Sequence, residues 1–119
     1  MKTTLVIGAS EKQDRYSNMA IKLLSNYNHK VFAIGNKLGK IGDINIEVGM
    51  PIFENIDTIT LYINSKLQIK YYNYILALHP KRIIFNPGTE NEELFQLAKE
   101  NKIDAIEACT LVMLKTNQY

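Results

Sequence analysis

The sequence contains a single cysteine, Cys109, and no tryptophan among its 119 residues. One cysteine excludes an internal disulfide, which is typical of proteins in a reducing compartment. No apolar run approaches the ~20 residues that a membrane-spanning helix needs. Residues 1–4 lead directly into a strand-like run, without the apolar stretch and cleavage site of a signal peptide. We therefore expect a cytoplasmic protein with no membrane partner.

Charge of one sign is also missing from part of the chain. The net charge is +2, from 14 basic and 12 acidic residues, which is too small to indicate nucleic acid as a partner. No acidic residue lies between Asp14 and Asp43. The basic residues in that window are Arg15, Lys22, Lys30, Lys37 and Lys40. Two interpretations stay open: a solvated helix face, or a site for phosphate groups.

Short apolar runs alternate with helical patterns along the chain. The runs cover residues 3–7, 30–34, 58–63, 82–85 and 105–106, and the helical patterns cover 18–27, 65–78, 91–101 and 109–114. This alternation predicts a single α/β domain over residues 1–119: a Rossmann-like, doubly wound parallel sheet of five strands in the order 3-2-1-4-5, with helices on both faces. Residues 36–56 replace one helix, and we expect a short strand at 44–48. Ser65 and Asn91 are the expected N-caps, and His79-Pro80 is expected to end a helix.

A ligand of such a sheet binds beyond the carboxyl ends of the strands, where the strand order reverses. We place that point between the first and fourth predicted strands. Small or polar residues follow the strands: Gly8-Ala9-Ser10, Gly35-Asn36-Lys37, Asn64-Ser65, Asn86-Pro87-Gly88 and Ala108-Cys109-Thr110. Each segment alone is a plausible turn. Together, at one edge, they indicate a site where a ligand approaches the backbone and phosphate meets helix amides.

Two nucleotide-binding motifs are missing. The first loop lacks the Gly-x-x-Gly spacing of a dinucleotide fingerprint, and the chain has no Gly-Lys-Ser/Thr phosphate loop. The acidic residue that holds an adenine ribose after the second strand is also absent, and Gly35-Asn36-Lys37 stands there. Because Lys37 or Lys40 would attract a ribose phosphate, this favours coenzyme A, with NADP as the alternative.

A catalytic set is hard to assemble from these residues. His29 and His79 precede strands and so belong at the opposite, amino edge of the sheet, and no ligand spacing indicates a metal site. Three carboxylates that could approach the site, Asp14, Glu90 and Glu107, are more often caps than acid–base groups. Cys109 fits a buried structural thiol better than a redox group.

At these loops the chain resembles the CoA-binding domain family, in its stand-alone bacterial form, similar to the N-terminal domain of the succinyl-CoA synthetase α subunit. The resemblance rests on residues 6–10, 15–20 and 37–42 and on the Gly-bearing turn after the strand at 82–85. It implies that the first loop and helix start hold the pyrophosphate. It also implies that residues after the second strand reach the adenosine and its phosphate, and that later loops face the pantetheine arm. The chain departs from the family pattern at Gln13 (usually Pro), Gly35-Asn36 (usually Asn-Pro), residues 86–89 (usually a Gln-containing turn) and Asn28 (usually Gly).

We therefore expect non-catalytic binding of coenzyme A or an acyl-CoA, a small-molecule nucleotide cofactor. The alternatives are an NADP- or acyl-CoA-using enzyme and a protein-interaction domain with an empty site, and a homodimer stays open. The expected cofactor-binding residues are Gly8, Ala9, Ser10, Arg15, Ser17, Asn18, Gly35, Asn36, Lys37, Lys40, Gly42, Asn64, Asn86, Pro87 and Gly88.

Overall fold

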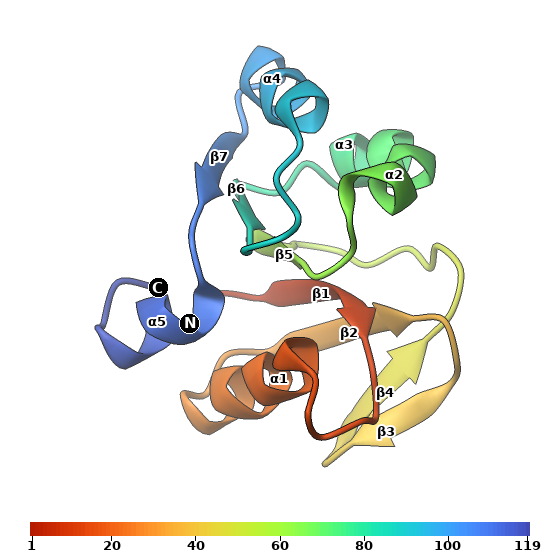
Figure 1. The fold of residues 1–119 in the computed structure, drawn as a ribbon, viewed down its shortest axis with the longest axis vertical. Coiled ribbons are helices and arrows are strands. Elements are labelled where there is room, and N and C mark those ends of the chain that lie inside the picture. Colours follow the sequence, from red (N-terminus) through yellow and green to blue (C-terminus); the bar gives the residue numbers. More distant parts are fainter.

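A computed structural model describes residues 1–119 and contains one seven-stranded sheet (Figure 1). The strands are β1 (Thr4–Ala9), β2 (Val31–Gly35), β3 (Gly39–Ile41), β4 (Ile44–Glu47), β5 (Thr58–Leu61), β6 (Arg82–Phe85) and β7 (Asp104–Glu107). The helices are α1 (Tyr16–Asn26), α2 (Ser65–Gln68), the 3₁₀ helix η1 (Ile69–Tyr71), α3 (Tyr72–Leu78), α4 (Glu92–Glu100) and α5 (Thr110–Lys115). All neighbouring strands are parallel except β3 and β4. The α/β, Rossmann-like class is confirmed.

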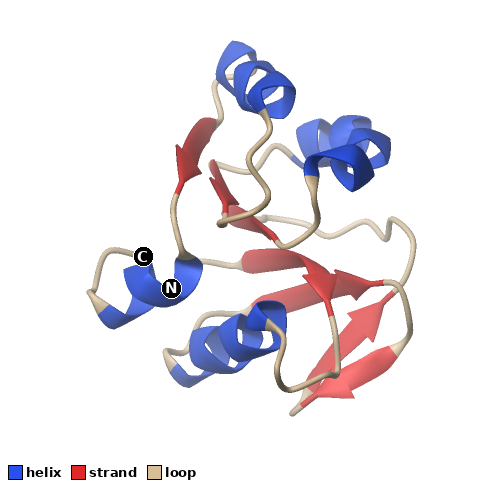
Figure 2. Cartoon of the chain, in the orientation of Figure 1, coloured by secondary structure: helices blue, strands red, loops and turns tan.

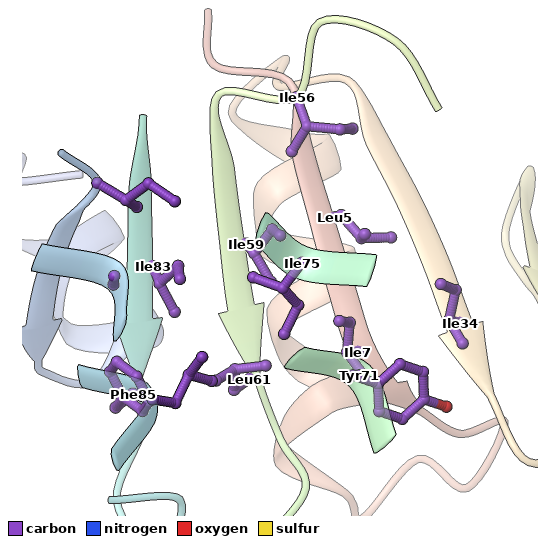
Figure 3. Close-up of a cluster of buried hydrophobic side chains, with 13 residues drawn as sticks. Leu5, Ile7, Ile34, Ile56, Ile59, Leu61, Tyr71, Ile75, Ile83 and Phe85 are labelled. Atoms are coloured by element: carbon purple, nitrogen blue, oxygen red, sulfur yellow. The ribbon is translucent and has the colours of Figure 1, made fainter. Parts of the chain in front are cut away.

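The helices cover the two faces of the sheet in separate groups (Figure 2). On one face, α1 and α5 pack against a cluster that includes Val6, Ile21 and Leu114. On the other face, the α2–η1–α3 segment and α4 bury a larger cluster. Figure 3 shows Tyr71 and Ile75 on the same side of the sheet as Ile7. Because both faces of the central strands are covered, these strands read as continuous apolar runs rather than alternating ones.

The strand order differs from the predicted one in a specific way. The observed order is β3-β4-β2-β1-β5-β6-β7. The predicted third strand, β5, lies between β1 and β6 instead of beside β2. The place beside β2 is taken by β4, which was expected at 44–48, and a two-residue turn at Gly42-Asp43 joins it to the unpredicted edge strand β3. The reversal of strand order therefore lies between β1 and β5.

The helix after β5 also differs from the prediction. The expected single helix at 65–78 is divided into α2, η1 and α3. Its N-cap is Asn64 rather than Ser65, because the Asn64 side chain accepts a hydrogen bond from the Leu67 amide at 3.0 Å. The expected cap at Asn91 is confirmed, with the Leu94 amide as its donor. No helix of the structure is long and apolar enough to cross a membrane.

Candidate functional site

A cavity of about 660 Å³ lies beyond the carboxyl ends of β1, β2 and β5. It is the edge at which a parallel sheet of this kind binds ligands. The structure brings the following predicted residues together in its lining: Gly8, Ala9, Ser10, Arg15, Ser17, Gly35, Asn36, Lys37, Asn64, Pro87 and Gly88. Four predicted residues lie outside the lining: Asn18, Lys40, Gly42 and Asn86.

The first turn of α1 opens onto the cavity without a cap. Its N-cap residue, Arg15, makes no side-chain capping hydrogen bond, and the first turn contains no acidic residue. The helices α2 and α4, in contrast, are capped by asparagine side chains. The first amides of a helix have no partner within the helix and carry partial positive charge. The start of α1 is therefore suited to an anion such as a phosphate group.

Asn18 does not line the cavity but contacts the loop that follows β1. Its side chain is 2% exposed, and its Nδ2 donates to the Ser10 carbonyl at 2.9 Å. This bond ties the loop after β1 to the first turn of α1. The Oδ1 of Asn18 is buried and has no partner within the protein, so only one half of the Asn18 amide is committed to the loop.

Three cations surround the cavity without an ionic partner. Lys12, Arg15 and Lys37 all line it. The one ion pair of the structure joins Lys81 and Asp57, far from these residues in sequence and at the amino end of β5. The only carboxylate in the lining is that of Glu11. The cavity thus carries an excess of positive charge toward an anionic ligand.

The structure explains, as the sequence alone did not, why two residues at the ends of β1 and β2 are glycines. Gly8 has φ +104°, and a Cβ atom there would lie 2.8 Å from the Tyr62 carbonyl oxygen. At Gly35 a Cβ atom would lie 2.4 Å from the Ala9 carbonyl oxygen. Both glycines therefore let neighbouring chain segments approach each other. They line the cavity, but close backbone packing alone explains why they are glycine.

Asn86 is committed to the protein rather than to a ligand. It is 2% exposed, and its Nδ2 donates to Thr60 Oγ1 at 2.6 Å and to the Leu61 carbonyl at 2.9 Å. Its Oδ1 accepts from the Thr110 amide at 2.9 Å. These bonds tie the ends of β5 and β6 to the start of α5. The expectation that Asn86 contacts a cofactor does not fit this geometry.

Lys40 and Gly42 also lie away from the cavity. Lys40 is in the edge strand β3, where its backbone amide donates to Glu11 Oε2 at 2.9 Å. Gly42 belongs to the turn between β3 and β4. Lys40 was expected near a ribose phosphate, and Gly42 was expected at the site because the family resemblance covers residues 37–42. The unpredicted strand β3 makes this segment half of a hairpin, and both residues lie outside the cavity lining.

Apolar side chains make up part of the lining that the sequence analysis missed. Three large apolar side chains of the lining are exposed to solvent: Tyr16 (70%), Leu38 (73%) and Leu67 (47%). Exposed apolar surface that gathers at one cavity is typical of a binding site. A signal for Leu38 was available, since it lies in the segment 37–42 on which the family resemblance rests. The other missed lining residues are Glu11, Lys12, Ile34, Tyr62, Ile63, Tyr71 and Thr89.

The lining offers few groups for chemistry. His29 is at the amino edge, where its Nδ1 accepts from the Lys2 amide at 2.9 Å, and neither histidine nor Cys109 lines the cavity. Burial raises the pKa of the Tyr62 hydroxyl, so this group stays protonated at neutral pH. Asp14, Glu90 and Glu107 are not lining residues. No group of three or more His, Cys, Asp or Glu residues is placed to hold a metal ion.

Comparisons with known proteins agree with this fold. A crystal structure of an uncharacterized protein is 45% identical in sequence, with a TM-score of 0.97 over 100% of this chain and 98% of that chain. A Thermus thermophilus structure is 16% identical, with a TM-score of 0.88 over 99% and 90% of the two chains. A hypothetical protein from Pyrococcus horikoshii OT3 is 21% identical, with a TM-score of 0.87 over 97% and 82%. The last two show the fold alone.

The search of curated proteins found no match. The search of protein families did: the family model described as the CoA binding domain matches residues 2–115, which is nearly the whole chain. This protein belongs to the CoA binding domain family.

Proposed function

We propose that this protein binds coenzyme A or an acyl-CoA in the cavity at the carboxyl ends of β1, β2 and β5, and performs no chemistry on it. The observation that carries the proposal is the uncapped start of α1, facing a cavity with three unpaired cations. Coenzyme A carries a pyrophosphate and a ribose phosphate, so it needs this excess of positive charge. Membership of the CoA binding domain family supports the same ligand.

The lining residues suggest which part of the ligand each would hold. The α1 amides and Arg15 suit the pyrophosphate, because helix amides and a guanidinium both bind phosphate oxygens well. Lys37, after β2, suits the ribose phosphate. The exposed Leu38 and Tyr16 offer apolar surface to the adenine, and Leu67 with Pro87-Gly88 offers a wall for the pantetheine arm. The cavity volume lies within the range of about 300–1,000 Å³ that is usual for small-molecule sites.

A binding role without catalysis is supported by what the lining contains. Nucleophilic and general-base catalysis need an activated side chain within hydrogen-bond reach of the reacting atoms. The lining holds no histidine or cysteine, burial raises the pKa of the Tyr62 hydroxyl, and the one carboxylate of the lining, that of Glu11, uses one oxygen to accept a hydrogen bond from the Lys40 backbone amide. An NADP-dependent enzyme remains the second candidate, because the same cations would attract NADP.

Native mass spectrometry of the freshly purified protein tests the ligand directly, and calorimetric titration with coenzyme A and NADP gives the preference. Arg15→Ala should weaken coenzyme A binding by about tenfold, the worth of a charge-assisted contact. Lys22→Ala is the matched control, since Lys22 is an exposed cation of the same helix outside the cavity lining. Tighter binding of NADP, or equal loss in the two variants, would contradict the proposal. Turnover of an acyl-CoA thioester would contradict its non-catalytic part.

A further inference from the structure

The Glu11 side chain crosses from the loop after β1 to the segment that follows β2. Its Oε2 accepts a hydrogen bond from the Lys40 amide at 2.9 Å. The side chain lies directly on Gly39, where a Cβ atom would be 2.5 Å from the Glu11 Cδ atom. Any larger residue at position 39 would therefore displace it. The hydrogen bond and the close approach to Gly39 place the carboxylate beside the segment that follows β2.

The second carboxylate oxygen of Glu11 has no partner within the protein. Oε2 is the only Glu11 side-chain atom that takes part in a hydrogen bond, and no ion pair involves Glu11, even though Lys12 is adjacent in sequence and Lys37 lines the same cavity. An acid in a cavity for an anionic ligand weakens binding by repulsion. Glu11 is exposed, and a ligand group that donates a hydrogen bond to its second oxygen would offset this repulsion.

Nucleotide-binding α/β folds use a carboxylate at this place. In the dinucleotide-binding version, an acid after the second strand accepts hydrogen bonds from the adenine ribose. This chain has no acid at the end of β2, where Gly35-Asn36-Lys37 stands. Glu11 supplies a carboxylate beside the same segment from a different loop. Glu11 could therefore do what the missing acid does, although it lies in a different loop of the sequence.

We propose that Glu11 accepts a hydrogen bond from the 2′-hydroxyl of the ligand's adenine ribose and so selects a 3′-phosphate over a 2′-phosphate. The proposal rests on the proposed function. In coenzyme A the ribose carries its phosphate on the 3′ oxygen, which leaves the 2′-hydroxyl free to donate to Glu11 while Lys37 attracts the phosphate. In NADP the phosphate is on the 2′ oxygen, where it would meet the Glu11 carboxylate and be repelled.

Two isomeric probes isolate this effect: adenosine 3′,5′-bisphosphate and adenosine 2′,5′-bisphosphate. They have the same charge, so the cations of the cavity attract both, and the ratio of their affinities reports the position of the phosphate. We expect wild-type protein to prefer the 3′ isomer by about tenfold or more, the worth of one hydrogen bond to a charged group. Calorimetry, or competition against coenzyme A, measures the ratio.

Glu11→Ala should bring the ratio close to one, whatever it does to overall affinity. Gly39→Ala should do the same without touching the ligand, because the new Cβ atom displaces the Glu11 side chain. Glu90→Ala is the matched control. The Glu90 carboxylate also accepts from a backbone amide, that of Gly88 at 3.0 Å, but lies outside the lining, so this variant should keep the wild-type ratio.

The outcomes separate the two proposals. A wild-type protein that binds coenzyme A but shows no preference between the isomers, or a preference that survives in Glu11→Ala and Gly39→Ala, overturns the role of Glu11 and leaves the proposed function standing. A wild-type protein that binds neither coenzyme A nor either isomer overturns both. Thermal denaturation of each variant shows whether it is folded before its ratio is read.

Discussion

Replacing two neighbouring lysines one at a time tests how the β3–β4 hairpin organises the site. The sequence analysis placed both Lys37 and Lys40 at a ribose phosphate. In the structure only Lys37 lines the cavity, and Lys40 lies in the edge strand β3. Lys37→Ala should therefore weaken coenzyme A binding, and Lys40→Ala should leave it almost unchanged. The two substitutions remove the same charge and the same side chain, so they control for each other.

The size of the Lys37 effect follows from its exposure. Two unit charges about 4 Å apart interact by about 1 kcal/mol in water and by about 4 kcal/mol near a protein surface. Lys37 is exposed, so the lower part of this range applies. We expect about 1.5 kcal/mol, which is about tenfold in affinity.

Calorimetric titration with coenzyme A and dephospho-coenzyme A measures this contribution as a thermodynamic cycle. Wild-type protein and Lys40→Ala should prefer coenzyme A by about tenfold, and Lys37→Ala should bind the two ligands equally. The preference should shrink as salt is added, because exposed charges are screened. Equal losses in the two lysine variants, or no preference in wild-type protein, would refute the assignment of Lys37 to the ribose phosphate.

Three further substitutions test the structural roles assigned above. Asn86→Ala leaves the Thr110 amide and other buried groups without partners, so it should destabilise the protein by about 3 kcal/mol, or roughly 10 °C in melting temperature, as thermal denaturation would show. Gly8→Ala should cost about 2 kcal/mol in a denaturant titration, because φ is +104° and the Cβ atom meets the Tyr62 carbonyl, and wild-type stability would contradict this role. Burial, with nearby positive charge, lowers the pKa of His29 below its usual 6.5. The unfolded chain therefore takes up this proton more readily, and stability should fall as the pH drops below about 6.5, a slope that His29→Gln should remove in denaturation curves.

Much of the fold could be predicted because its central strands are buried on both faces. The runs that became β1, β2, β5 and β6 are short and apolar, and a parallel sheet follows from the helices between them. The β3–β4 hairpin was harder to predict. Its strands are short and partly exposed, so residues 36–56 contain no continuous apolar run like those of the central strands. The five-strand prediction left β4 out of the order and so placed β5 beside β2 instead of between β1 and β6, and because β3 was not predicted, Lys40 and Gly42 were expected at the site.

The candidate site could be located from topology, but its individual contacts could not. The edge of the sheet follows from strand direction alone, which is why most of the predicted residues meet at one cavity. Glu11 was missed because a single acid in an exposed loop belongs to no recognisable sequence motif. Its position at the site depends on contacts with Gly39 and Lys40, which lie far from it in the sequence. Gly8 and Gly35 were assigned to ligand binding because a sequence does not show which backbone segments pack against them.

The asparagines at the carboxyl edge show what separates a structural polar group from a binding one. Asn64 and Asn86 lie where a ligand contact was expected. The Asn64 side-chain oxygen, however, caps α2, and both the Nδ2 and the Oδ1 of Asn86 form hydrogen bonds within the protein. A polar group whose bonds are already made gains little from a ligand. The first amides of α1, the Lys37 ammonium and one oxygen of Glu11 have no such partners. Specificity in this cavity should therefore reside in these unpartnered groups, and substitution of Asn86 should change stability before it changes ligand preference.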